Sequence, residues 1–389
     1  MSILYLEADG DFGSLFERNA MSTTVFEKKK TPAEVSNPLG IKGIDHIEFI
    51  VDDANNWRDY FMNNFGMAPR AYADEKSRPG RRAHVVGQGR INFLIAEPAS
   101  KGDDADELRE HIEKHGNGVK DVAFRVADAR KALEEADARG ATVVHGLFEQ
   151  NGFRAGSIAA YGDTIHTFIE RKGREFAPGY KNVAGGMEDG DINFAMVDHV
   201  VANVERMDEW VEYYSNIFGF ETKMHFDINT GRSALMSKVV GSEDGYIKLP
   251  INEPSSKNSQ IQEYLDEYRG PGVQHIALLT PNILATVGEM RKQGVDFLDV
   301  PDSYYDEELK KRIGEIEEDV TELNKLKILV DRDRPDGYLL QLFTQCVFNR
   351  PTLFFEVIQR RGNSEGFGEG NFTALFEAIE REQKKRGSL

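Results

Sequence analysis

The acidic residue that most needs explaining is Glu356, which stands in the apolar run Leu-Phe-Phe-Glu-Val-Ile. An uncompensated carboxylate in such a strand would cost several kcal/mol to bury, so we expect a cation or a metal ion as its partner. Two histidines, His199 and His275, stand in other apolar, strand-like runs. Two imidazoles and one carboxylate on one face form the ligand set of non-heme Fe(II) sites that use O2. These three residues are the candidate metal ligands, and ordinary core histidines are the alternative.

The first half of the sequence lacks this set. When the two halves are compared position by position, the three candidates are matched by His46, Asp121 and Thr167. Only one imidazole is retained there, so we interpret His46 as a structural remnant of a repeat. The chemistry is expected in the second half alone.

This comparison depends on an internal repeat. The segment that begins Ile44-Asp-His-Ile-Glu resembles the segment that begins Val197-Asp-His-Val-Val, at an offset of 153 residues. Each continues through an amphipathic helix to a Phe-Gly pair before the next strand. A second pair, beginning Gly118-Val-Lys-Asp and Gly272-Val-Gln-His, repeats the pattern inside the halves. Self-similarity of this kind indicates duplicated structural units.

Alternating apolar runs follow each of these helices, so every unit has the pattern of one strand, one helix and three strands. We expect an α+β protein in which four such units curl into two open barrels lined by alternate strand residues. The ranges 338–344 and 352–358 are predicted to form a hairpin around a turn at 349–351. The predicted divisions are a flexible leader at 1–36, a metal-free barrel domain at 37–171, a linker at 172–190, a catalytic barrel domain at 191–389, an exposed helix at 306–325 and a lid helix at 373–386.

Composition excludes several classes of protein. The 389 residues carry a formal net charge of -18, which would repel nucleic acid and anionic membranes. Cys346 is the single cysteine, so an intramolecular disulfide and a cysteine-rich metal site are excluded, and a reducing cytoplasm is indicated. Apolar runs as long as a membrane span are absent from the sequence. A soluble cytoplasmic protein is therefore expected.

Polar and aromatic side chains around the three candidates predict a pocket. Amide and hydroxyl groups occur on or beside strands that should point inward, where an ordinary barrel core would be apolar. Phenylalanines could supply the walls for an aromatic ring, although core packing is their simpler interpretation. The polar candidates are Ser237, Asn252, Gln260, Gln274, Gln341 and Asn371, and the aromatic candidates are Phe343, Phe354, Phe367 and Phe372.

Other motifs point to no chemistry. His111 and His115 have the i,i+4 spacing of a helical metal site but lack the glutamate of a zinc protease, so we interpret them as the polar end of a helix. The Gly366–Gly370 loop has no strand-turn-helix context for a dinucleotide, and its glycines suggest a hinge. Cys346 is expected to be a structural residue of the hairpin.

Long segments of the second half resemble the 4-hydroxyphenylpyruvate dioxygenase family, and the similarity extends over about residues 37–387. The segments that carry it include Val197-Asp-His-Val-Val, Leu249-Pro-Ile-Asn-Glu-Pro254, Gly272-Val-Gln-His-Ile-Ala-Leu278, Leu340-Gln-Leu-Phe-Thr344, Phe354-Phe-Glu-Val-Ile-Gln-Arg360 and Gly366-Phe-Gly-Glu-Gly-Asn-Phe372. The resemblance implies the vicinal oxygen chelate fold, with Fe(II) held by His199, His275 and Glu356. It also implies a homo-oligomer, either a dimer or a tetramer.

The resemblance further implies the reaction. The family converts an aromatic 2-oxo acid and O2 to homogentisate and CO2 in tyrosine and phenylalanine catabolism, by oxidative decarboxylation, ring hydroxylation and side-chain migration. It places Phe343 and Phe372 on either side of the ring and assigns gating of the pocket to Phe367, Asn371 and the terminal helix. The other implied contacts are Ser237, Asn252 and Gln260, which orient the substrate, Gln274 and Gln341, which lie close to the metal, and Pro250 and Phe354, which line the pocket.

Other functions compete with this one. A 4-hydroxymandelate synthase would share the fold, the iron ligands and the substrate, but Phe343 and the Pro250-Ile-Asn252 segment resemble the dioxygenase. A non-catalytic protein that binds aromatic ligands would not need the complete ligand set. An extradiol dioxygenase would need a further base, and a zinc or manganese hydrolase is the remotest alternative.

Overall fold

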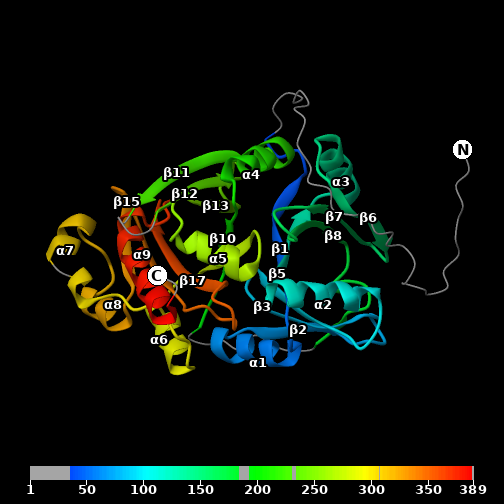
Figure 1. Ribbon diagram of the computed structural model, residues 1–389, viewed down its shortest axis with the longest axis horizontal. Coiled ribbons are helices and arrows are strands. Elements are labelled where there is room, and N and C mark those ends of the chain that lie inside the picture. The colour runs from blue at the N-terminus through cyan, green and yellow to red at the C-terminus, as the bar shows by residue number, and fades with distance from the viewer. Residues whose placement is uncertain (1–35, 184–191, 230–233, 306, 388–389) are drawn as a thin grey trace, which may run out of the picture.

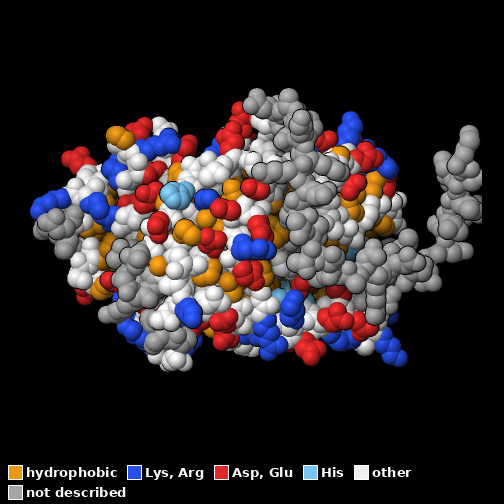
Figure 2. Space-filling view, turned by 45° about the horizontal axis from the view of Figure 1, so that its top comes forward, with side chains coloured by type: hydrophobic (Ala, Val, Ile, Leu, Met, Phe, Trp, Pro, Cys, Tyr) orange, Lys and Arg blue, Asp and Glu red, His pale blue; other side chains and the backbone are white. Residues whose placement is uncertain are grey.

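The computed structural model describes residues 36–183, 192–229, 234–305 and 307–387. The leader predicted at 1–36 lies outside these residues, apart from Ser36. In the described part of the chain, no helix is both long enough and apolar enough to span a bilayer. On the face shown in Figure 2, acidic and basic side chains are interspersed, and its described residues form no continuous basic stripe.

The first half forms one nine-stranded sheet in the order β6-β7-β8-β5-β1-β4-β3-β2-β9. Its elements are β1 (Ile41–Ile50), α1 (Ala54–Phe65), β2 (Ala68–Ala73), β3 (Arg81–Gln88), β4 (Ile91–Pro98), α2 (Asp103–His115), β5 (Gly118–Val126), α3 (Ala129–Ala138), β6 (Val143–Gln150), β7 (Phe153–Ala159), β8 (Ile165–Arg171) and β9 (Lys181–Asn182).

The second half forms an eight-stranded sheet in the order β11-β12-β13-β10-β14-β17-β16-β15, and lies beside the first half (Figure 1). Its elements are β10 (Met196–Asn203), α4 (Met207–Tyr213), the π-helix η1 (Tyr214–Phe218), β11 (Glu221–Asn229), β12 (Ala234–Gly241), β13 (Lys248–Pro254), α5 (Gln260–Tyr268), β14 (Gly272–Leu279), α6 (Ile283–Lys292), the 3-10 helix η2 (Asp302–Tyr305), α7 (Glu307–Ile313), α8 (Val320–Leu326), β15 (Leu329–Arg334), β16 (Gly337–Phe343), β17 (Phe354–Gly362), the 3-10 helix η3 (Glu369–Asn371) and α9 (Phe372–Arg386).

Strand pairing confirms the four predicted units. In the first half, β1 pairs in parallel with β4, β5 pairs in parallel with β8, and β1 and β5 join the two units antiparallel. The second half repeats this plan with β10 and β13, β14 and β17, and an antiparallel β10–β14 junction. Each sheet therefore curls as a half-barrel made of two strand-helix-strands units, as the sequence predicts.

The repeated Phe-Gly pairs end the first helix of each half. Helix α1 begins where the Asp53 side chain accepts a hydrogen bond from the amide of Asn56, which satisfies one free backbone donor. It ends at Gly66, where φ is 63°, and η1 ends at Gly219, where φ is 71°. This left-handed conformation favours glycine, because a side chain would be strained there.

Two predicted divisions differ in detail from the structure. The helix predicted at 306–325 is two short helices, α7 and α8, because the chain turns at Gly314, where φ is 66°, and Asp319 caps the start of α8. In addition, β9 lies within the range predicted as the linker and pairs with β2.

The hairpin of β16 and β17 is buried on both faces. Phe343 is the cross-strand partner of Glu356, and the predicted turn at 349–351 lies between the two strands. Successive side chains of a strand point to opposite faces, so Phe355 projects away from the side on which Glu356 lies. The Phe355 ring centroid lies 4.9 Å from that of Phe65 and 5.7 Å from that of Phe61, both in the first half. The strand that carries Glu356 is thus anchored to the other half by its opposite face.

This packing makes Phe355→Ala strongly destabilising. We expect the substitution to lower the free energy of unfolding by about 3–5 kcal/mol, because it removes a fully buried ring from an aromatic cluster. Urea denaturation followed by circular dichroism measures the change. The matched control is Tyr246→Ala, whose side chain is 57% exposed and should change stability by less than about 0.5 kcal/mol. Equal effects of the two substitutions would show that the cluster does not hold the halves together.

Candidate metal centre and its pocket

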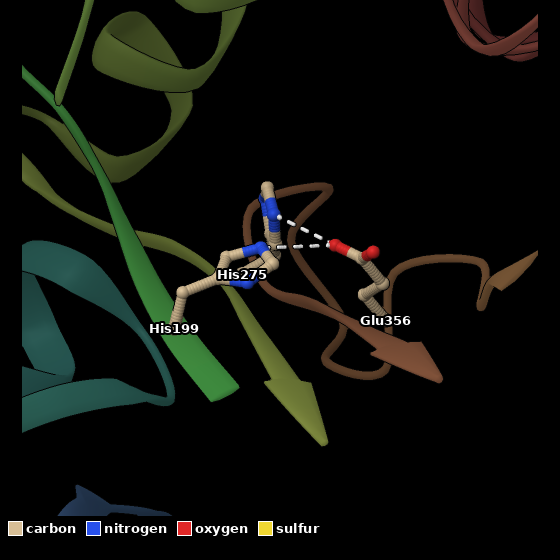
Figure 3. Close-up of side chains that lie close together, drawn as sticks. All are labelled: His199, His275 and Glu356. Carbon is tan, nitrogen blue, oxygen red and sulfur yellow. Dashed lines mark ion pairs between the residues drawn. The ribbon is translucent and has the colours of Figure 1, made fainter. Parts of the chain in front are cut away.

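Three neighbouring strands bring His199, His275 and Glu356 together. The strands β10, β14 and β17 are adjacent in the sheet, and Ala277 on the middle strand is the cross-strand partner of both His199 and Glu356. His275 lies two residues before Ala277 and therefore on the same face. Figure 3 shows the two imidazoles and the carboxylate pointing toward one another. The register of the sheet alone thus places all three side chains on one face of the barrel.

The distances are those of a compact cluster. Oε2 of Glu356 lies 3.1 Å from Nε2 of His199 and 3.5 Å from Nε2 of His275. One potential ligand atom from each residue lies within 4.8 Å of the others. The second carboxylate oxygen, Oε1 of Glu356, is buried and has no hydrogen-bond partner among the described residues. An orphaned carboxylate oxygen beside two imidazole nitrogens fits a site for one divalent cation.

The electrostatics of the cluster are coupled. Burial disfavours the charged carboxylate of Glu356, but the imidazoles of His199 and His275 together outweigh this effect and lower the pKa of Glu356. Burial also opposes a charge on His199, yet the Glu356 carboxylate raises the pKa of that imidazole. At His275 burial prevails and lowers the pKa. A neutral imidazole keeps the nitrogen lone pair that a metal requires.

The other nitrogen of each imidazole faces a side chain next to it in the sequence. Nδ1 of His199 lies 2.8 Å from Oδ1 of Asp198, and Nδ1 of His275 lies 3.0 Å from Oε1 of Gln274. An oxygen acceptor at Nδ1 favours the tautomer with the proton on that atom, which leaves Nε2 free to bind a metal. Gln274, predicted to lie close to the metal, therefore lies behind a candidate ligand. Asp198 is a site residue that sequence reasoning missed, although the Asp-His pair is part of the repeat.

A pocket adjoins the three residues. Most of the predicted pocket residues line it. These are Ser237, Pro250, Asn252, Gln260, Gln274, Phe343, Phe354, Phe367 and Phe372. Further apolar residues on the strands, on α5 and on the terminal helix line the pocket and were not predicted, although helical and strand periodicity marks them: Val201, Phe226, Ile228, Leu235, Ile261, Leu375, Phe376 and Ile379.

The aromatic walls lie on two sides of the pocket. Phe354 stacks on the His275 ring with centroids 4.8 Å apart, and Phe343 meets the same ring edge-on at 6.1 Å. Near the terminal helix, Phe226 meets the Phe372 ring at 5.1 Å and the Phe367 ring at 6.4 Å. Gln260, the first residue of α5, has a buried Oε1 without a hydrogen-bond partner among the described residues.

Gln341 and Asn371 are not among the lining residues. Asn371 instead turns its Oδ1 toward the hydroxyl of Tyr304, which donates a hydrogen bond of 2.5 Å. Gln341 lies beneath Gly368 of the loop that leads to α9, where any larger residue would collide with its amide. Asn371 therefore contacts Tyr304 and holds the start of the terminal helix. Gln341 lies between the sheet and the loop that leads to that helix.

The first half shows what the same scaffold does without the ligand set. Asp121 and Thr167, the counterparts of His275 and Glu356, bond to each other, since Asp121 Oδ1 accepts from the Thr167 amide at 3.1 Å. Ser157 lies 2.8 Å from the Thr167 hydroxyl and extends this network. The one group suited to a metal among the described residues lies in the second half.

No chemistry is expected of His111, His115 or Cys346, and their surroundings in the structure agree with this. His111 and His115 lie at the end of helix α2, which is capped by Gly116 as predicted, and both imidazoles are buried. His115 stacks on Tyr268 at 4.3 Å and pairs with Asp163 through Nε2 at 2.7 Å. Burial raises the pKa of the Cys346 thiol to about 12, which is unsuited to a nucleophile.

With the geometry established, comparison with known proteins defines the class. Residues 196–342 match the family model "Glyoxalase/Bleomycin resistance protein/Dioxygenase superfamily", and residues 35–180 match "Hydroxyphenylpyruvate dioxygenase, HPPD, N-terminal". A variant of 4-hydroxymandelate synthase from Streptomyces coelicolor is 27% identical with a TM-score of 0.79, covering 88% of this chain and 99% of that one. The fold is that of a vicinal oxygen chelate protein.

Curated relatives then specify the family. The chain is 42% identical to 4-hydroxyphenylpyruvate dioxygenase of Yarrowia lipolytica, over 92% of this chain and 97% of that protein. It is also 42% identical to the Caenorhabditis elegans protein of that name, over 89% and 93% of the two chains. The chain belongs to the 4-hydroxyphenylpyruvate dioxygenase family. These relatives favour the dioxygenase over 4-hydroxymandelate synthase.

The buried carboxyl of the first half predicts a specific pH dependence. Burial raises the pKa of Asp121 to about 7 from an ordinary value of 3.8, so the folded protein retains a proton that the unfolded chain releases. The stability that this proton contributes is complete below about pH 4 and is lost as the pH rises through about 7. In urea titrations, wild type should therefore lose on the order of 1–4 kcal/mol relative to Asp121→Asn between about pH 4 and pH 8. A difference that stays constant with pH would contradict the assignment.

Proposed function

We propose that this protein converts 4-hydroxyphenylpyruvate and O2 to homogentisate and CO2, with Fe(II) held by His199, His275 and Glu356. The observation that carries the proposal is the convergence of these side chains from adjacent strands at one end of an aromatic-walled pocket. Fe(II) at this position would bind the 2-oxo acid and activate O2. The reaction belongs to tyrosine and phenylalanine catabolism.

The pocket supplies the remaining requirements for the substrate. Phe343 and Phe354 form one apolar wall beside His275, which suits an aromatic ring and excludes water. Ser237 and Asn252 are cross-strand partners on β12 and β13, and both are buried. Together with Gln260 they provide hydrogen-bonding groups that orient the polar parts of the substrate, while Phe367 and the terminal helix cover the site.

Assembly and location belong to the same proposal. We expect a homo-oligomer, a dimer or a tetramer, in the cytoplasm. An edge strand is available for contact between copies, since β6 is the outermost strand of the first sheet.

The reaction itself is tested by product analysis. The protein is incubated with 4-hydroxyphenylpyruvate, ferrous iron, ascorbate and O2, and the products are separated by chromatography. We expect homogentisate. Formation of 4-hydroxymandelate would instead identify the synthase, and binding of the substrate with no product would identify a non-catalytic binding protein.

The role of the carboxylate is tested by Glu356→Gln. The substitution keeps the size of the side chain but removes its charge, so turnover should fall by more than about 100-fold, beyond the effect of residues that only support a ligand. Bound iron per chain, measured by mass spectrometry, should fall with it. The matched control is His46→Asn, in the half without the ligand set, which should keep both iron and turnover. Full turnover by the Glu356 variant would refute the assignment.

A further inference from the structure

Asp198 lies between a candidate metal ligand and an arginine. Its Oδ1 is 2.8 Å from Nδ1 of His199, and Arg360 binds it through two bonds, with Nη2 to Oδ1 and Nε to Oδ2 both 2.8 Å long. Asp198 is only 3% exposed. A buried carboxylate with a bidentate arginine stays ionised and has one fixed orientation.

The ionised carboxylate determines the tautomer of His199. A carboxylate without a proton can only accept hydrogen bonds, so Nδ1 of the imidazole must carry the proton. The lone pair is then on Nε2, which faces Glu356. Arg360 therefore acts on the metal-binding nitrogen through Asp198.

Arg360 also holds the loop that covers the pocket. Its remaining nitrogen, Nη1, donates to the carbonyl oxygen of Gly366 at 2.7 Å, and its Cζ lies 5.8 Å from the centre of the Phe367 ring. That ring meets the His199 ring edge-on at 5.0 Å. One guanidinium thus joins the residue behind the metal ligand to the start of the loop that leads into α9.

The first half contains a copy of this arrangement. Asp45 lies 2.8 Å from Nδ1 of His46 and is bound by Arg171, with 2.6 Å between Nη2 and Oδ1. Arg171 Nε donates to the carbonyl oxygen of Phe176, and its Cζ lies 4.8 Å from the centre of that ring. The Phe176 ring meets the His46 ring edge-on at 5.2 Å. The same local contacts therefore occur where the carboxylate and the second imidazole are missing.

We propose that Asp198 and Arg360 are a pair of positioning residues that fixes Nε2 of His199 for metal binding and latches the Gly366–Phe367 turn over the pocket. The proposal rests on the proposed role of His199 as a metal ligand. Neither residue lines the pocket. Because the two tasks share one guanidinium and one carboxylate, weakening the pair loosens the ligand and the covering loop together.

Metal affinity tests the first task. The full-length protein is stripped of metal with a chelator and titrated with Co²⁺ in an isothermal calorimeter. Asp198→Asn should bind Co²⁺ about 10–100-fold more weakly, because an amide can donate to Nδ1 and so favour the tautomer that blocks Nε2. Asp45→Asn makes the same change in the first half, and its Co²⁺ affinity should equal that of wild type.

The outcomes separate the two proposals. Wild-type affinity in Asp198→Asn overturns the tautomer role alone. Failure of the wild-type protein to bind Co²⁺ overturns the metal site, and this inference with it. An equal loss of affinity in Asp198→Asn and Asp45→Asn would show a general effect on folding and would also overturn the inference.

Hydrogen exchange tests the latch. In Arg360→Lys, amides in residues 364–371 should exchange about fivefold faster, as expected for the loss of about 1 kcal/mol of hydrogen bonding. Arg171→Lys is the matched control and should leave this segment unchanged. Asp198→Asn, which removes the charge that holds Arg360, provides a second variant with the same expected increase. Unchanged exchange in both second-half variants overturns the latch.

Discussion

The constraint on which the rest of the structure depends is the burial of the Glu356 carboxylate. Water cannot stabilise it, so its neighbours must, and they are the imidazoles of His199 and His275 at 3.1 and 3.5 Å. This proximity requires a fixed register, in which Ala277 pairs with a candidate ligand on each side. A slip of one residue in either strand would turn a ligand to the opposite face, so the packing that fixes the register is also what makes the site.

The same strand connects the site to the other half. Glu356 points into the second barrel, and its neighbour Phe355 packs against Phe61 and Phe65 of the first. The first barrel thus contributes a rigid support at the back of β17, although its own counterpart of the site holds a network of Asp121 and Thr167. Duplication has given two similar scaffolds, and the difference in chemistry comes from the residues at two matched strand positions.

The Asp–Arg pair behind the imidazole occurs in both halves, whereas the complete set of candidate metal ligands occurs in the second half. The pairs Asp45–Arg171 and Asp198–Arg360 each bind an imidazole from behind and hold an aromatic turn in front. Their presence in both halves shows that this arrangement forms with or without the complete set of candidate ligands. In the second half, this turn leads to helix α9, whose apolar side chains line the pocket. The turn is therefore part of the proposed site.

The sequence by itself determined the four strand-helix-strands units, the hairpin, the three candidate ligands and most of the pocket, because these depend on local periodicity and on comparison between the halves. Only the tertiary structure decided what depends on contacts between distant segments. In the folded chain, Asn371 faces Tyr304 and His115 is buried against Tyr268. The range 306–325, predicted as one helix, forms two helices. The tertiary structure also joined Arg360 to Asp198, although 162 positions separate them in the chain. Such contacts are set by how elements pack against one another, and periodicity along a single strand or helix carries no information about that packing.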